Sequence, residues 1–477
     1  MSGGRVRGSG SGGGSGVAGA GAGAGAGGGA GGGAGVVAGA RRRVPAGPYF
    51  PRRGNDGYVV EHYELTLDYH VGTNRLSAVA VVTAWATSRL TSLTLDFADL
   101  RVDRVILQDG RRLRFEHRKE KLKVVLPAPV AAGEQVVLEI VYRGAPRPTS
   151  SRYGPLGWEQ LADGVLVASQ PTGAPSWFPC NDRPDQKSTY RIQVTTASQY
   201  RVVANGRLAG VAHSGSTSTW TFVQDVPMAT YLATVQMGVY QRAELSGHRG
   251  GVPLVLVAPA RRLDAARAAL ARQDAMVALF GRLFGPYPFG AYTVVVTDDR
   301  LEIPVEAQGV SMFGSNHMGG DWDGERLIAH ELAHQWFGNS LTLGDWRDIW
   351  LHEGFACYAE WLWSEGSGGR SADGHARLWH GRLARLPQDV VLADPGPADL
   401  FDDRIYKRGA LTLHALRLSV GDEAFFGLMR EWTARFRHAT VTTAGFLETV
   451  SAQVPGRDLG GFFQAWLHET ALPELPR

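Results

Sequence analysis

The sequence predicts an α+β protein of more than one domain, with an antiparallel β domain first and a mainly α-helical domain after it. From Tyr58 to about Pro259, apolar and polar residues alternate with period two, which is typical of half-buried strands. After that point apolar residues recur at spacings of three and four, which indicates helices. We therefore expect a tail over residues 1–53, a β-sandwich-like domain over 54–257 and a helical domain with a small sheet over 258–477.

The individual elements follow from these periods and from turn signals. Alternating segments at 62–69, 104–107 and 135–142 predict strands, and Asp109-Gly110 and Asn205-Gly206 predict turns between strands. In the second half one strand is expected over 292–297. Helices are expected near 263–284, 324–338, 352–366, 407–419, 422–437 and 459–468.

The predicted tail has an unusual composition. Residues 1–40 hold 20 of the 62 glycines and consist almost entirely of Gly, Ala, Ser and Arg, so they cannot bury a core and are expected to be disordered. Arg5 and Arg7 before a run of small residues imitate a signal peptide, but Gly and Ala are too weakly apolar for its central region. We expect a cytoplasmic protein, with secretion as the alternative.

Charge and cysteine content exclude several classes of function. The net charge is only +3, and residues 1–53 carry seven arginines and no Lys, Asp or Glu, so the rest of the chain is net acidic. No nucleic-acid partner is therefore expected. Cys180 and Cys357 are the only cysteines, which excludes a disulfide framework. No apolar stretch approaches the roughly 18 residues of a membrane span, so no membrane partner is expected.

The strongest chemical signal is His330-Glu331-Leu332-Ala333-His334, in a segment with helical periodicity. Residues four apart share a helix face, so both imidazoles can reach one metal ion with Glu331 beside it. Imidazole nitrogen suits zinc, and two histidines leave room for a third ligand and a water. Glu353 lies 19 residues after His334 at the start of another predicted helix. We expect one Zn²⁺ per chain, held by His330, His334 and Glu353.

These motifs resemble a known family. His330 to Gly338, followed by Trp350 to Ala356, is similar to the zinc aminopeptidases of the aminopeptidase N and leukotriene hydrolase family, the gluzincin metallopeptidases. Further matches are Trp177 to Asp182, Glu306 placed 24 residues before His330, and Tyr406 to Ala410. The resemblance runs from about Gly54 to the C-terminus. It implies a thermolysin-like catalytic domain that removes single residues from peptides with a free N-terminus.

The catalytic roles combine chemistry with this resemblance. Glu331 follows a metal ligand directly and is placed to take a proton from the zinc-bound water and pass it to the leaving amine. The tetrahedral intermediate needs a hydrogen-bond donor opposite the metal. The resemblance assigns that donor to Tyr406.

Three more side chains are candidates for supporting roles. Glu306 matches only the glutamate of the family's Gly-Ala-Met-Glu-Asn motif, where a carboxylate binds the substrate α-ammonium group. Gln170, twelve residues before Asp182, has the spacing at which the family places a second contact to the substrate N-terminus, with a strand-edge glutamine that binds water as the alternative. Glu360 lies seven residues after Glu353 on the same helix face and is a candidate hydrogen-bond partner for a ligand histidine, with a surface carboxylate as the alternative. His352 is expected to be a neighbour of the site and not a ligand.

Two questions stay open at the level of sequence. The chain ends soon after Trp466-Leu467, so we expect a short form without the large C-terminal helical domain of longer relatives, with a more open cleft and a homo-oligomer as a candidate assembly.

The same zinc site could serve an endopeptidase or an epoxide hydrolase. A zinc-stabilised binding module is a third alternative, but Glu331 and Tyr406 beside an open metal position argue against it.

Overall fold

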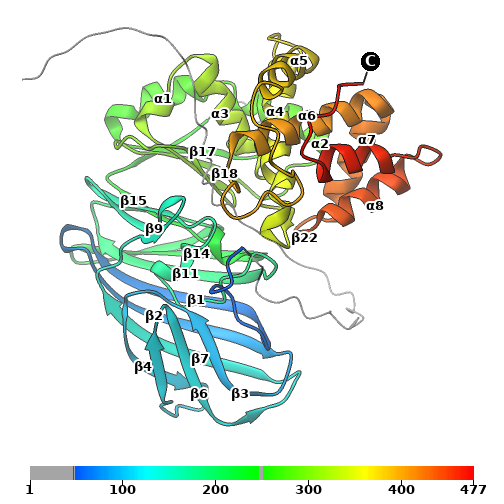
Figure 1. Ribbon diagram of the computed structural model, residues 1–477. Helices are drawn as coiled ribbons and strands as arrows, with labels where there is room; N and C mark the ends of the chain where they lie inside the picture. Colours follow the sequence, from blue (N-terminus) through cyan, green and yellow to red (C-terminus); the bar gives the residue numbers. More distant parts are fainter. Residues whose placement is uncertain (1–46, 48, 246–250, 477) are drawn as a thin grey trace, which may run out of the picture.

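The computed structural model describes residues 47, 49–245 and 251–476 (Figure 1). Most of the predicted tail, residues 1–46 and 48, lies outside the described residues. Two residues that the sequence analysis assigned to the tail pack onto the folded protein. Tyr49 Oη donates a hydrogen bond to Asp394 Oδ1, and the Phe50 ring meets the Trp346 ring edge-on at a centroid distance of 6.0 Å.

The N-terminal domain is built on three sheets. The largest has the strand order β13-β14-β11-β1-β2-β7-β4, a five-stranded sheet has the order β12-β15-β10-β9-β8, and a three-stranded sheet has the order β3-β6-β5. The strand bounds are β1 Tyr58–His70, β2 Arg75–Ala86, β3 Leu90–Asp96, β4 Arg101–Leu107, β5 Phe115–Arg118, β6 Lys121–Val130, β7 Gln135–Gly144, β8 Thr149–Ser151, β9 Gly154–Leu161, β10 Gly164–Ala168, β11 Ser188–Ala197, β12 Arg201–Ala204, β13 Arg207–Ser214, β14 Thr217–Met228 and β15 Val235–Gly238.

Strand β1 shows why the alternating pattern produces this domain. Tyr63, Leu65 and Leu67 are fully buried, while the residues between them face outward. Such alternation places one face of the sheet on the core. β1 pairs antiparallel with β2 but parallel with β11, so the prediction of an antiparallel domain holds for most strand pairs and fails for this one. Period two gives the buried face of a strand and does not give its direction.

A fourth sheet, which is mixed, belongs to the following domain. Its strand order is β16-β17-β18-β20-β19. The strands and the two crossover helices are β16 Gln241–Glu244, β17 Leu254–Ala258, α1 Leu263–Ala269, α2 Gln273–Phe284, β18 Tyr292–Val296, β19 Val305–Ala307 and β20 Val310–Phe313. β17 and β18 are parallel, with α1 and α2 between them in the chain. Both β16 and β17 therefore belong to this sheet, although the sequence analysis placed residues up to 257 in the β domain.

Helices make up the rest of this domain (Figure 1). They are α3 Trp322–Ala333, α4 Trp350–Gly366, α5 Ala372–Leu383, α6 Asp403–Val420, α7 Asp422–Arg435, α8 Thr443–Gln453 and α9 Gly460–Phe463, which continues into a π-helical turn over Gln464–His468; β21 Thr342–Leu343 pairs with β22 Thr440–Val441. The sequence analysis did not predict α5 and α8. The hydroxyl groups of Ser371 and Thr442 cap the N-termini of α5 and α8, which stabilises both helices. The two glycines within α5 weaken its helical pattern in the sequence.

Two glycines set the distance between α4 and α6. A Cβ atom on Gly354 would lie 2.8 Å from the Gly409 Cα atom, and one on Gly409 would lie 2.6 Å from the Gly354 Cα atom. Only glycine at both positions lets the helices cross this closely. The crossing brings the first turns of α4 and α6 together, and these turns carry Glu353 and Tyr406.

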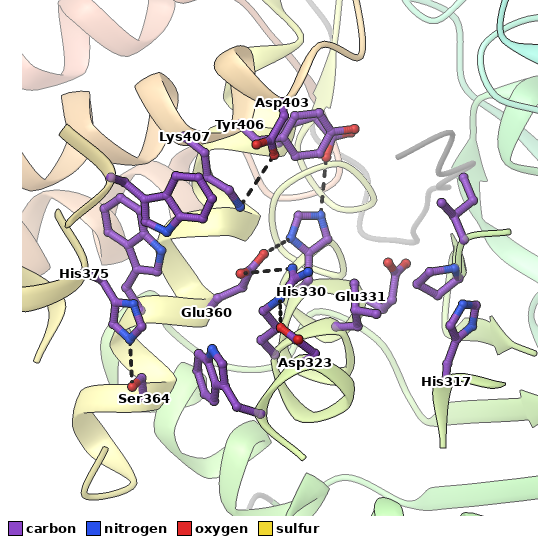
Figure 2. A pocket seen from close by; sticks show the side chains of 18 of the residues that line it. His317, Asp323, His330, Glu331, Glu360, Ser364, His375, Asp403, Tyr406 and Lys407 are labelled. Atoms are coloured by element: carbon purple, nitrogen blue, oxygen red, sulfur yellow. Dashed lines mark hydrogen bonds and ion pairs between the residues drawn. The ribbon is translucent and has the colours of Figure 1, made fainter. Parts of the chain in front are cut away.

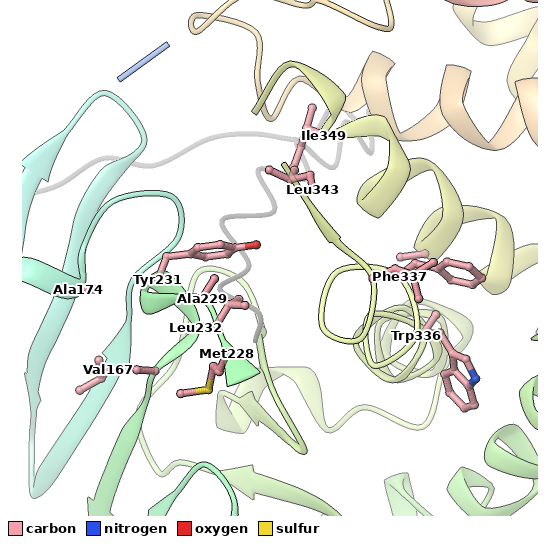
Figure 3. Close-up of a cluster of buried hydrophobic side chains, with 14 of the residues drawn as sticks. Val167, Ala174, Met228, Ala229, Tyr231, Leu232, Trp336, Phe337, Leu343 and Ile349 are labelled. Carbon is pink, nitrogen blue, oxygen red and sulfur yellow. The ribbon is translucent and has the colours of Figure 1, made fainter. Parts of the chain in front are cut away.

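The two domains share one apolar core. Figure 3 shows Tyr231, Leu232 and other buried side chains of the β domain facing Leu343 and Ile349 of the helical domain. The Tyr231 ring lies 4.9 Å from the Trp346 ring, and Lys187 Nζ donates to the Ser340 carbonyl oxygen at 3.0 Å. The loop that follows His334 is therefore held in part by the β domain. Among the described helices, none combines the length and apolarity that crossing a bilayer requires.

Candidate metal centre and active site

Helix α3 positions the first two candidate ligands, His330 in its last turn and His334 as the residue that caps its C-terminus. Asp321 caps its N-terminus by accepting a hydrogen bond from the Gly324 N–H at 3.0 Å. Ile328 and Leu332 are fully buried and fix the rotation of the helix about its axis. That rotation turns His330 and His334, one helical turn apart, toward α4.

Three ligand atoms converge between α3 and α4. Glu353 Oε2 lies 3.4 Å from His330 Nε2 and 3.5 Å from His334 Nε2. Two atoms each about 2.1 Å from the centre of a tetrahedron are roughly 3.4 Å apart, so the separations match a tetrahedral zinc site. Within the described residues, this is the only group of three or more His, Cys, Asp or Glu side chains with such convergence.

The other ring nitrogens of both histidines are already engaged. His330 Nδ1 lies 2.8 Å from Glu360 Oε1, and His334 Nδ1 lies 3.0 Å from the Phe337 carbonyl oxygen. Both acceptors require a proton on Nδ1, which leaves the Nε2 lone pairs free to bind a metal. The predicted position of Glu360 beside a ligand histidine is what the structure shows.

The charges around the ligands favour a cation. Burial opposes ionisation of Glu360, but Lys407, Arg326 and the hydrogen bond with His330 outweigh it and lower the pKa of this carboxyl group to about 2. Burial likewise opposes ionisation of Glu353, and the two histidines outweigh it and lower its pKa. Two buried carboxylates therefore stay negative around the imidazoles.

Unpartnered atoms provide an independent test of the fit to zinc. Glu353 Oε1 and Glu331 Oε2 are buried without a hydrogen-bond partner among the described residues. Buried carboxylate oxygens are normally paired, so these two are placed for a ligand. Together with the donor set of two imidazoles and one carboxylate, they fit a zinc ion with an open coordination position.

Tyr406 reaches the site from the first turns of α6. Its side chain is 5% exposed, and its ring stacks on the His330 ring at a centroid distance of 6.0 Å and an angle of 20°. Burial raises the pKa of its hydroxyl well above the ordinary value, and the carboxylates of Glu353 and Glu306 raise it further. The phenol therefore stays protonated and able to donate a hydrogen bond.

Glu306 enters the site from the sheet. It lies in β19, the edge strand, opposite Ser311 of β20. Its side chain is 1% exposed, and Oε2 has no hydrogen-bond partner among the described residues. Burial raises the pKa of its carboxyl group. A cation bound beside Glu306 would stabilise the ionised carboxylate, so the site favours a positively charged ligand.

Gln170 and His352 stand apart from the ligand cluster. Gln170 follows β10, is 1% exposed, and neither its amide oxygen nor its amide nitrogen has a partner among the described residues. His352 Nε2 accepts a hydrogen bond from the Leu343 N–H at 2.9 Å, and burial lowers its pKa to about 3. His352 is thus a structural neighbour and not one of the three converging residues.

The predicted residues meet in one cavity of about 650 Å³. It is lined by seven of them, namely Glu306, His330, Glu331, His334, Glu353, Glu360 and Tyr406, but Gln170 is not among the described residues that line it. Arg326, Trp379 and Lys407 line the same cavity and were not predicted from the sequence to have a role. Figure 2 shows Lys407 near Glu360. Arg326 could have been found, because it precedes His330 by four residues on the same helix face.

Comparison with known proteins agrees with this geometry. The sequence matches the Peptidase M1 N-terminal domain over residues 59–232 and the Peptidase family M1 domain over residues 269–466. Aminopeptidase B from Rattus norvegicus is 26% identical over 393 residues, which cover 75% of this chain and 58% of that protein. Leukotriene A-4 hydrolase from Xenopus laevis is 24% identical over 418 residues, covering 80% and 66%. The chain thus spans less than two thirds of the length of each of these relatives.

Solved structures match over nearly the whole described chain. The crystal structure of an M1 zinc metallopeptidase from Deinococcus radiodurans has a TM-score of 0.83 and 32% sequence identity, covering 91% of this chain and 100% of that one. A mutant of that metallopeptidase bound to a Tyr-Ser-Ala substrate matches with the same TM-score, identity and coverage.

Proposed function

Because the chain belongs to peptidase family M1, whose solved members include zinc metallopeptidases, we propose that it is a zinc aminopeptidase that releases single residues from peptide N-termini. The observation that carries the proposal is the position of Glu306. A buried carboxylate with an unpartnered oxygen lines the same cavity as the three converging ligands. The tripeptide bound to the Deinococcus radiodurans relative and the aminopeptidase activity named for aminopeptidase B support the same reaction.

His330, His334 and Glu353 would hold one zinc ion per chain. When bound, zinc polarises a carbonyl group and makes water acidic enough to attack near neutral pH. The chain holds the ligand atoms in place through Glu360 and the Phe337 carbonyl, which orient the two imidazole rings.

Glu331 is the proposed general base. Its Oε2 atom is buried without a partner among the described residues, and burial raises the pKa of its carboxyl group. A carboxylate with a raised pKa accepts a proton from water more readily and can return it to the leaving amine. Glu331 therefore takes the proton as water attacks and delivers it as the peptide bond breaks.

Tyr406 is the proposed donor to the oxyanion. Its raised pKa keeps the proton on the hydroxyl, and its stacking on the His330 ring fixes its position beside the ligands. A fixed donor in a buried site stabilises the charge that develops on the carbonyl oxygen in the transition state.

Glu306 and Gln170 are proposed to recognise the substrate amine. A protonated α-amino group forms charge-assisted hydrogen bonds with a carboxylate, and a peptide blocked at its N-terminus loses them. The unpartnered amide of Gln170 supplies a candidate second acceptor, although no contact joins it to Glu306.

Two finer points also belong to the proposal. We place the protein in the cytoplasm, in keeping with Cys180 and Cys357, which are both free and buried. Cell fractionation tests this location. A homo-oligomer that covers the cleft remains part of the proposal, and sedimentation that finds only monomers would remove it.

The function is tested with one peptide in two forms, a free amine and its N-acetyl derivative, and with mass spectrometry of the products. We expect residues to be released one at a time from the free form only, with activity lost to a chelator and restored by zinc. Cleavage of the acetylated form would favour an endopeptidase. No cleavage of either form, with zinc still bound, would favour a binding module.

A further inference from the structure

The cavity continues past the metal ligands into a region that the proposed mechanism does not use. Figure 2 shows His330 between His317 on one side and Lys407 and His375 on the other. His317 follows β20, which pairs with the strand that carries Glu306. If Glu306 holds the substrate amine, the residue after the scissile bond lies on the opposite side, toward α5 and α6.

That region has an aromatic wall. The His375 ring stacks between Trp322, at a centroid distance of 5.6 Å, and Trp361, at 6.2 Å, with small interplanar angles. Ser364 Oγ donates to the Arg370 carbonyl, so it accepts the Nε2 proton of His375 at 2.9 Å. The wall is therefore rigid and largely apolar.

Its end is cationic. Lys407 Nζ lies 4.9 Å from the centroid of the Trp379 ring, and Arg382 Cζ lies 4.7 Å from the same centroid. Burial disfavours the charged form of Lys407, but the carboxylates of Glu360 and Asp403 favour it, and the pKa of this ammonium group lies above its ordinary value. Lys407 is thus a buried cation at neutral pH.

The ammonium group of Lys407 has unused hydrogen-bonding capacity. Its hydrogen-bond acceptor is Cys357 Sγ at 3.2 Å, a weak acceptor, and the nearest paired carboxylate oxygen, from Asp403, is 3.9 Å away. Glu360 faces the same region, but its oxygens are taken by His330 at 2.8 Å and Arg326 at 3.5 Å. An ammonium group has three protons, so Lys407 can bind a carboxylate brought in by a ligand.

We infer that Lys407, with Arg382 at the rim, is a specificity determinant that selects peptides with a carboxylate on the residue directly after the scissile bond. This carboxylate is either the free C-terminus of a dipeptide or the side chain of Asp or Glu. The inference rests on the proposed aminopeptidase function and names the class of substrate that it prefers. It does not require Lys407 to take part in bond breaking.

The test compares kcat/KM of the zinc-loaded full-length chain on four substrates with the same first residue: Leu-Ala, Leu-Ala-amide, Leu-Glu-amide and Leu-Gln-amide. A charge-assisted hydrogen bond predicts a preference of about tenfold or more for the carboxylate member of at least one pair. Preference within the first pair identifies a dipeptide C-terminus, and preference within the second identifies an acidic side chain.

Three variants assign that preference to Lys407. Lys407→Met should reduce it to within about twofold, while Lys407→Arg should retain most of it, because a cation in place keeps most of the charge-assisted bond. Arg385→Gln is the matched control, since Arg385 is exposed near the end of α5 and does not line the cavity; it should leave the preference unchanged. If Lys407→Met does not fold, Arg382→Gln should still lower the preference by about threefold, as expected for a partly screened cation.

The outcomes separate the two proposals. Cleavage of all four substrates without a carboxylate preference, or a preference unchanged in Lys407→Met, overturns the role of Lys407 and leaves the aminopeptidase standing. A structural role for Lys407 would lower activity on all four substrates equally and would not change their ratio. Absence of cleavage of every substrate overturns both proposals.

Discussion

The candidate ligand histidines and the carboxylate of Glu306 lie on two sides of the cavity and differ in how the protein holds them. On the helical side, Glu360 of α4 and the Phe337 carbonyl of the loop after α3 hold the two candidate ligand histidines, at 2.8 and 3.0 Å. On the strand side, Glu306 is also buried, yet its Oε2 atom has no partner among the described residues. The protein itself supplies a partner for the second ring nitrogen of each histidine, but it supplies none for this oxygen of Glu306.

This difference separates two requirements of the reaction. A metal ligand must be oriented before the metal arrives, so its second nitrogen is fixed by the fold. A recognition group must exchange water for substrate, so its partner has to come from outside. In the proposed reaction, the fixed histidines would bind the metal, and the unpaired oxygen of Glu306 would bind the substrate amine.

The largest expected effect is the loss of kcat when the proposed general base, Glu331, is replaced. Glu331→Gln keeps the shape of the side chain but cannot accept the proton, so kcat should fall at least about a hundredfold with zinc still bound. Tyr406→Phe should cost a similar factor through the lost oxyanion donor. Zinc analysis and steady-state kinetics check both, and full activity in either variant would remove the role assigned to that residue.

The next effect tests the strand side. Glu306→Gln removes the charge that would bind the substrate ammonium group, so kcat/KM on free-amine peptides should fall by about 10- to 100-fold, as expected for a charge-assisted hydrogen bond. Zinc affinity should not change. Kinetics on leucine coumarin amide measure the first quantity, and wild-type kinetics in this variant would contradict the assignment.

The corresponding Glu-to-Gln change on the helical side, at Glu360, should alter zinc affinity instead of substrate recognition. Glu360→Gln weakens the hydrogen bond that orients His330, so zinc affinity should fall by about 10- to 100-fold. Activity at saturating zinc should be largely preserved. Competition with a chromophoric chelator measures the affinity, and an unchanged value would mean that the contact at 2.8 Å does not support the metal.

The smallest effect is expected at Gln170. Its amide is neutral, so Gln170→Ala should raise KM by only about threefold to tenfold, the range for one neutral hydrogen bond. The matched control is Gln186→Ala, because Gln186 is a β-domain glutamine whose side-chain oxygen already accepts a hydrogen bond from Asn181. Equal kinetics in both variants would place Gln170 outside the recognition site.

The same contrast explains what could be predicted from the sequence. The prediction that His330, Glu331 and His334 lie together depends only on helical spacing, and that of Glu360 only on its distance from Glu353. The structure brings these side chains together, and their roles stay predictions. The helices that carry them begin within two residues of the predicted starts. These features require no knowledge of how distant segments pack.

The remainder depends on tertiary packing. Lys407 and Trp379 meet only because α5 and α6 lie together, and α5 was not predicted, since Gly374 and Gly381 weaken its helical signal. Likewise, the alternating pattern extends the β domain through residue 257, but the structure pairs residues 254–257 with the parallel strand β18 of the other domain. Alternation shows that a strand is half-buried and does not show which sheet it joins.

The most direct test of this division is to measure zinc affinity and amine discrimination together in Glu306→Gln and Glu360→Gln. Discrimination is the ratio of kcat/KM for leucine coumarin amide to that for its N-acetyl derivative, at saturating zinc. The account predicts that Glu306→Gln loses discrimination with unchanged zinc affinity and that Glu360→Gln loses affinity with unchanged discrimination. Loss of zinc in Glu306→Gln, or full discrimination in the same variant, would contradict it.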